Sequence, residues 1–137
     1  MNQNSETVFN LYKIQNKLLK RLDQSLTVHG ISITEFMVMH HLSHCANHCM
    51  RRIDLAEQVG LSASGVTRLL NPMQKIGLVQ KEDSARDARV SLVKLTDSGR
   101  ALFSDAQKTY QQCADSYLSP FSKQQHASFS GLVQKLL

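Results

Sequence analysis

The chain lacks any long apolar run. Nothing in its 137 residues approaches the roughly 18 consecutive apolar positions of a membrane-spanning helix. The segment Met1–Glu6 also lacks the basic and then apolar layout of a secretory signal peptide. Cysteine is scarce, and its odd count of three favours reduced thiols over a disulfide framework. We therefore expect a cytoplasmic protein with no membrane partner.

The chain also lacks a recognisable catalytic grouping. Covalent catalysis needs a nucleophile, a base and a donor group for the developing negative charge. Cys45 with His41 or His48 is the only plausible nucleophile and base, and no oxyanion element accompanies them. Internal repeats and low-complexity linkers are missing too, so we expect one domain of ordinary size. We predict neither enzyme activity nor a cofactor.

What the chain has in excess is positive charge. Its formal net charge is +5 and its isoelectric point is about 9.3. Such a balance favours partners that carry phosphate. Between Arg51 and Arg100, nine lysines and arginines stand against six acids, an excess of three. The excess therefore falls in the part of the chain with the clearest structural signals.

The middle of the chain carries closely spaced signals for short elements. Apolar spacing over Ile53–Val59 predicts a short helix that ends at Gly60, because glycine adopts positive φ without steric cost. Ser62 is placed to cap a second helix. Alternating stretches around the polar loop 83–88 predict a β-hairpin, and Thr96 is placed to cap a further helix. This order of elements is that of a winged helix-turn-helix.

Particular residues in these elements resemble a known family. They are Leu55, Ala56, Gly60, Leu61, Ser62, Val66, Thr67, Arg68, Leu69, Gly77, Leu78, Val79, Asp87, Ala88, Arg89, Leu95, Thr96, Gly99 and Arg100. Their order and spacing resemble the MarR (multiple antibiotic resistance regulator) family of bacterial transcription factors. The resemblance implies a mainly α fold with a small β-hairpin wing. Within a single domain 1–137, it implies a winged helix-turn-helix lobe over about 33–100 and a helical dimerisation region over about 5–30 and 101–137.

The two ends of the chain are predicted to be helical. From Val8, apolar residues at steps of three and four predict one long helix to about His29. Thr34 is placed to cap a central apolar helix. After a break at Pro120, residues 122–125 form a capping box for the last helix.

A long amphipathic helix at the start of a small protein needs a surface to pack against. The resemblance implies that the terminal helices of two subunits interlock, and a helix packed only within its own subunit is the alternative. We expect the dimer interface to include Val8, Leu11, Leu18, Leu22, Phe129, Leu132 and Leu136.

The second helix of the motif has the side chains that a DNA-reading helix requires. Ser62, Ser64 and Thr67 are short and polar near its start, and Arg68 is a longer donor further along. Arg68 is predicted to contact guanine, with a phosphate contact as the alternative. Ser62 is expected to act chiefly as a cap that aims helix amides toward phosphate. Pro72 is predicted to kink this helix.

The wing and the start of the first helix supply further cations. Arg86 is expected to reach the minor groove, whose negative potential attracts arginine. By resemblance, Asp87 and Arg89 form the family's Asp-x-Arg element, in which the carboxylate orients the guanidinium; an ordinary exposed ion pair is the alternative. Arg51 and Arg52 are predicted either to contact phosphates or to be a solvated helix start.

Histidines and cysteines gather between residues 40 and 49. If the helix continued, one face would carry His41, His44, Cys45, His48 and Cys49, a ligand set suited to zinc or copper. We favour the alternative of a helix C-terminus followed by a loop with incidental cysteines, because no second ligand pair appears elsewhere. A thiol redox switch is a third interpretation.

Together these patterns predict a sequence-specific regulator of transcription that binds double-stranded DNA. The resemblance implies a homodimeric repressor that reads a pseudo-palindromic operator and is released by a small aromatic or phenolic effector. A metal- or thiol-responsive regulator built on residues 40–49 is one alternative. A winged-helix module that binds another protein and no DNA is the other.

Overall fold

The computed structural model describes residues 1–137, and its elements follow the predicted order. The fold is mainly α-helical with a small antiparallel sheet, which confirms the predicted fold class. Two 3-10 turns, Thr27–His29 and Ala46–His48, link helices and strands. The elements are α1 (Gln3–Leu26), α2 (Ile33–Ser43), β1 (Cys49–Arg51), α3 (Arg52–Val59), α4 (Ala63–Lys75), β2 (Val79–Asp83), β3 (Ser91–Leu95), α5 (Asp97–Tyr117) and α6 (Lys123–Gln134).

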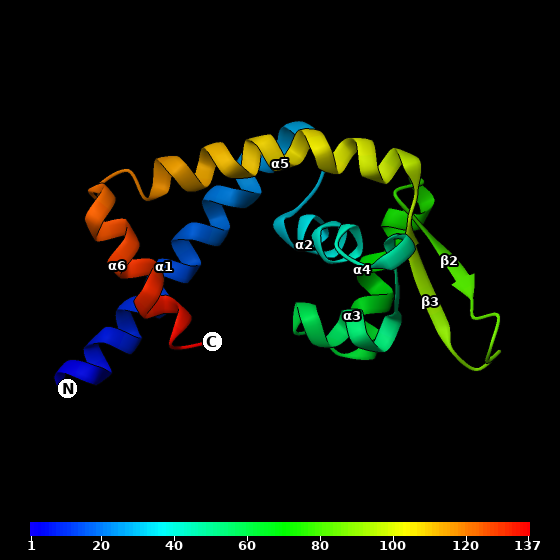
Figure 1. The fold of residues 1–137 in the computed structure, drawn as a ribbon, viewed down its shortest axis with the longest axis horizontal. Coiled ribbons are helices and arrows are strands. Elements are labelled where there is room, and N and C mark those ends of the chain that lie inside the picture. Colours follow the sequence, from blue (N-terminus) through cyan, green and yellow to red (C-terminus); the bar gives the residue numbers. More distant parts are fainter.

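The long helix α5 connects two ends of the molecule (Figure 1). At one end lie α1, α6 and both chain termini. At the other end α2, α3, α4 and the β2–β3 hairpin form a lobe whose hydrophobic core is continuous with α1 and α5. Both α1 and α2 pack against α5. The helix-turn-helix and the wing are therefore held at a distance from the terminal helices.

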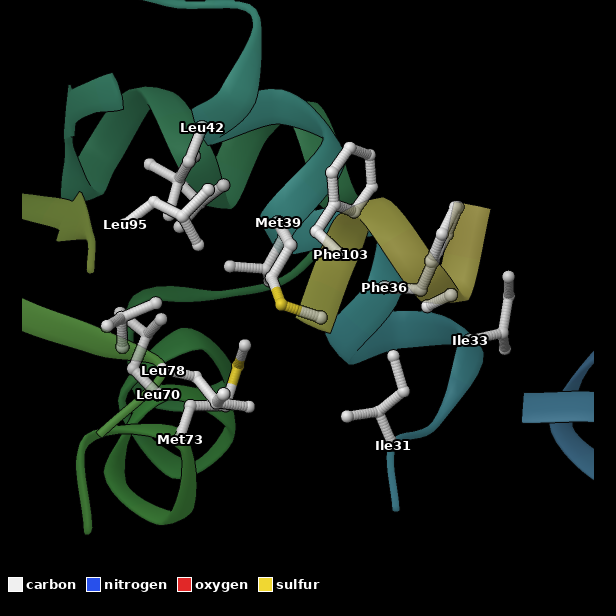
Figure 2. Close-up of a cluster of buried hydrophobic side chains, with 14 of the residues drawn as sticks. Ile31, Ile33, Phe36, Met39, Leu42, Leu70, Met73, Leu78, Leu95 and Phe103 are labelled. Atoms are coloured by element: carbon white, nitrogen blue, oxygen red, sulfur yellow. The ribbon is translucent and has the colours of Figure 1, made fainter. Parts of the chain in front are cut away.

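The core of the lobe is built around α2. This helix is apolar on nearly all sides and buries Phe36, Val38, Met39 and Leu42. A helix with apolar residues all round is one that other elements surround. Figure 2 shows its side chains facing those of α4, α5 and the sheet. The Phe36 ring stacks on Tyr110 of α5 at a centroid distance of 4.7 Å.

The caps predicted from the sequence set most helix boundaries. The Thr96 hydroxyl accepts from the backbone N–H of Gly99 at 3.0 Å, and Ser122 forms the predicted capping box with Gln125. The prediction for α2 was wrong by two residues. Its cap is Ser32 in place of Thr34, because Ser32 and Glu35 exchange side-chain and backbone hydrogen bonds of 3.1 and 2.8 Å.

The sheet has a third strand that the sequence pattern did not reveal. Strand β1 pairs with β3, which lies between β1 and β2, and all pairings are antiparallel. Val93 of β3 is opposite both Met50 of β1 and Lys81 of β2. Because β1 runs directly into α3, it fixes the base of the wing to the first helix of the motif.

One residue of the predicted dimer interface is buried within its own subunit. Leu22 of α1 is only 5% exposed and lies in the subunit's own core, so it has little surface to offer a second copy. Leu18 is partly buried against the same core. By contrast, Val8 is 65% exposed, and α6 has no buried residue at all. The apolar surface without a partner therefore comprises the first half of α1 together with α6.

Candidate nucleic-acid interface

The start of α4 presents a polar face to solvent. Gly60 ends α3 with a φ of 69°, which turns the chain sharply toward the next helix. The Ser62 hydroxyl then accepts from the backbone N–H of Gly65 at 3.1 Å, as predicted for a cap. Ser64 and Arg68 are exposed, while the opposite face of the helix is buried. The structure thus brings the predicted reading residues to one accessible helix face.

Pro72 lies inside α4, in its last turn. The helix continues past it to Lys75, and the kink predicted at this proline stays a prediction. The N–H that proline lacks would have bonded to the carbonyl of Arg68, so the lost hydrogen bond is near the helix end. The first two turns, which carry the exposed polar residues, lie before the proline.

The wing holds the Asp87 and Arg89 pair in the geometry implied by the family resemblance. The Asp87 carboxylate accepts from the Arg89 backbone N–H at 3.0 Å, from Nε at 3.2 Å and from Nη2 at 3.3 Å. These hydrogen bonds lower the pKa of Asp87 below its ordinary value. The Arg89 side chain remains 91% exposed, and Arg86, also exposed, forms no ion pair. The wing therefore offers two accessible guanidinium groups.

The adjacent residues Arg51 and Arg52 have different partners. Arg51 forms a two-pronged ion pair with Asp54, from Nε at 2.9 Å and from Nη2 at 3.1 Å. Arg51 lowers the pKa of Asp54 chiefly through this hydrogen bonding. Arg52 Nη2 donates to the hydroxyl of Thr67 at 2.6 Å, which links α3 to the exposed face of α4. The sequence placed the two arginines together but could not show this difference.

A cleft of about 870 Å³ separates the helix-turn-helix from the wing. Four cationic side chains line it, with Glu57 as the only acid. A concave surface lined by one sign of charge concentrates the electric field and attracts ions of the opposite sign. Lys81 of β2 and Ser91 of β3 also line the cleft. The lining cations are Arg51, Arg52, Lys81 and Arg89.

The structure does not assemble the histidine and cysteine cluster into a metal site. Helix α2 ends at Ser43, and Asn47 and His48 adopt positive φ values of 57° and 54° that turn the chain into β1. The helical face assumed for ligation therefore never forms, and no group of three or more His, Cys, Asp or Glu side chains is arranged so that it could hold a metal ion. The residues concerned are His41, His44, Cys45, His48 and Cys49.

The surroundings of Cys49 do not favour a thiol switch. Its Sγ donates to Glu82 Oε2 at 3.5 Å. Burial, followed by the contact with Glu82, raises the pKa of Cys49 above the ordinary value for a thiol. A raised pKa lowers the thiolate fraction at neutral pH, and the thiolate is the reactive form.

Three imidazole rings lie together at the C-terminal end of α2. The His40 ring centroid is 4.4 Å from that of His44 and 5.3 Å from that of His41. Burial lowers the pKa of His40, and the neighbouring imidazoles His44 and His41 lower it further. Burial and His44 act in the same way on the pKa of His41. His40 and His41 therefore resist protonation.

We expect the histidines to make the fold sensitive to mild acid. A folded-state pKa below the unfolded value of about 6.5 means that stability is fully present above that pH and is lost as pH falls through the folded-state pKa. The midpoint temperature of thermal unfolding should therefore fall more between about pH 7 and about pH 5 in the wild type than in a His40→Gln, His41→Gln variant. His126→Gln, in the exposed helix α6, is the control and should follow the wild type. An equal pH dependence in all three proteins would contradict the assignment.

Comparison with known proteins shows the family to which the chain belongs. A family profile described as transcriptional regulator SarA/Rot matches residues 11–106. The chain belongs to the SarA/Rot family of transcriptional regulators. One relative of this SarA/Rot chain, the transcriptional repressor MprA of Escherichia coli, is 26% identical over 124 residues, which are 90% of this chain and 70% of MprA.

Solved structures agree with the fold of the SarA/Rot chain. AbsC, a MarR family transcriptional regulator from Streptomyces coelicolor, has a TM-score of 0.87 at 16% identity, over 99% of this chain and 93% of AbsC. A MarR variant from Escherichia coli, crystallised with operator DNA, has a TM-score of 0.85 at 21% identity, over 100% and 99% of the two chains. The SarA/Rot chain therefore has a MarR-like winged-helix fold, and the family to which it belongs is one of transcriptional regulators. None of its helices is both long and apolar enough to cross a membrane.

Proposed function

We propose that this SarA/Rot family protein binds double-stranded DNA in a sequence-specific manner through α4 and the wing. The observation that carries the proposal is the exposed polar start of α4 beside a cleft lined by four cations. Short side chains near the N-terminus of a helix allow close approach to base edges, and a longer donor completes the readout. Ser64 and Arg68 supply these, and Ser62 directs the helix amides toward phosphate.

We further propose that the protein acts as a homodimer. The winged helix-turn-helix lobe, about 33–100, would read DNA, and the helical region formed by about 5–30 and 101–137 would join two copies. Support comes from the exposed apolar side chains of α1 and α6, which lie at the same end of the molecule (Figure 1). A twofold dimer would place its two α4 helices about 34–36 Å apart, which matches one turn of DNA and a pseudo-palindromic operator.

For regulation we propose repression that a small aromatic or phenolic effector relieves. The relative MprA is described as a transcriptional repressor, which supports repression as the sign of the effect. An effector that binds better to a dimer with the wrong spacing between its wings would shift the population away from the DNA-bound state. A search for aromatic compounds that reduce operator affinity without unfolding the protein tests this part of the proposal.

Selection from a random duplex pool, followed by a salt titration, tests DNA binding. The recovered operator should bind more tightly than random duplex, and its affinity should fall steeply as salt rises, because phosphate contacts release counterions. A winged-helix module that recognises another protein would instead show little affinity for any duplex at any salt concentration.

We expect Arg68 and Arg86 to contribute differently to binding. Arg68→Ala should relax base preference, since a bidentate contact to guanine contributes about 1–3 kcal/mol of discrimination. Arg86→Ala should weaken binding to operator and random duplex by a similar factor, because a wing contact to the backbone and minor groove carries little sequence information. Fluorescence anisotropy with both duplexes measures each variant. If both variants lost the same factor on operator and random duplex, the assigned roles would be wrong.

A further inference from the structure

Of the two arginines that open α3, only Arg52 is free of a carboxylate. Arg51 commits its Nε and Nη2 to the two oxygens of Asp54. Arg52 lies within the same cleft and forms no ion pair with any acid. Neutralisation by Asp54 reduces the attraction of Arg51 for an external phosphate, because the carboxylate repels that phosphate. The two neighbouring arginines are therefore not equivalent as phosphate ligands.

The hydroxyl of Thr67 determines where the Arg52 guanidinium lies. Thr67 Oγ1 donates to the Ala63 carbonyl one turn earlier at 3.1 Å, which leaves its lone pairs for other partners. One of them accepts Arg52 Nη2 at 2.6 Å. A guanidinium has five N–H donors in a planar fork, so four remain available. Because the only proton of the Thr67 hydroxyl is donated to the Ala63 carbonyl, the hydroxyl has no proton left to donate to an acceptor atom of a base.

We propose that Arg52 binds a phosphate of the DNA backbone at the edge of the cleft and that Thr67 is the positioning residue that holds its guanidinium there. The inference rests on the DNA binding proposed above and reassigns Thr67 from reading bases to supporting a phosphate contact. Lys81 and Arg89, which reach the same cleft from the wing side, strengthen the local positive potential. The bidentate fork of Arg52 suits the tetrahedral oxygens of phosphate.

The dependence of operator affinity on salt tests Arg52. The full-length protein is titrated with fluorescent operator and with random duplex at several salt concentrations. Arg52→Gln should reduce the slope of log affinity against log salt by about 0.9 for each subunit, with an equal loss of affinity for both duplexes. Lys108→Gln is the matched control: this cation is paired with Asp105 on α5 and lies outside the cleft, so the slope should stay close to that of the wild type. A slope that changed equally in both variants, or in neither, would overturn the proposal.

The role of Thr67 is tested by its dependence on Arg52. Thr67→Val removes the hydroxyl but retains the branched shape and should weaken binding to both duplexes roughly two- to tenfold. Thr67→Ser, which retains the hydroxyl, should restore affinity, and Thr67→Val should have no further effect when Arg52→Gln is already present. A change in base preference on Thr67→Val, or full additivity of the two variants, would overturn the positioning role. If the proposed function itself is wrong, the wild-type protein will show no salt-dependent affinity for duplex DNA, which is a different result from either of these.

Discussion

A Val8→Glu, Leu132→Glu variant is expected to be monomeric and to lose operator affinity by about a hundredfold or more, equivalent to about 2.7 kcal/mol. Both side chains are apolar and more than half exposed in the isolated subunit, at 65% and 60%. The variant should therefore fold normally. In the proposed dimer the same side chains are buried, and an unpaired carboxylate in an apolar interface costs several kcal/mol. A monomer also contacts only half of the operator.

Sedimentation equilibrium and anisotropy with operator DNA measure the two effects on one protein preparation. Gln134→Glu is the control for added charge, since it places one negative charge at an exposed polar position of α6, where the double variant adds two. It should remain dimeric and bind operator as the wild type does. If the double variant stayed dimeric, the interface would lie elsewhere on the surface. If the variant became monomeric and kept its full affinity, dimerisation would not be needed for DNA binding.

The helix-turn-helix and the helix caps could be predicted because their signals are local. A hydroxyl at Ser62 or Thr96 satisfies backbone amides within the next turn, so three or four residues of sequence are enough to reveal the helix start. The apolar period of α1 predicted a helix in the same way. Period alone could not tell which partner covers each apolar residue, and Leu22 was therefore placed in the wrong interface.

The remaining features depend on contacts between distant parts of the chain. Strand β1 has three residues, too few to show alternation, and it exists because β3 offers a free edge beside it. Composition does not show that Arg51 pairs with Asp54 while Arg52 donates to Thr67, since the two arginines are adjacent at the start of the same helix. The candidate residues could be named from the sequence, but the partner of each arginine required coordinates.

Gly99→Ala is expected to destabilise the fold more than a glycine-to-alanine substitution at any other glycine of the chain. Gly99 is buried in the first turn of α5, where a Cβ atom would lie 2.2 Å from the carbonyl oxygen of Leu78 and 2.7 Å from Leu95 Cδ1. The backbone at Leu78 cannot easily retreat, because its carbonyl accepts from the N–H of Thr96 at 3.1 Å and the adjacent Gly77 carbonyl accepts from the Thr96 hydroxyl at 2.5 Å. Overpacking of this kind costs about 3 kcal/mol.

Gly131→Ala provides the matched control for this prediction. Gly131 is also helical, but it lies in α6 with open space around its Cα, so the added methyl meets nothing within 4 Å. Both substitutions gain about 1 kcal/mol of helix propensity, and the difference between the two variants therefore isolates the clash. Thermal unfolding should show a midpoint lowered by roughly 10 °C for Gly99→Ala and slightly raised for Gly131→Ala. Equal midpoints would mean that α5 does not pack against the turn before β2 as closely as the structure shows.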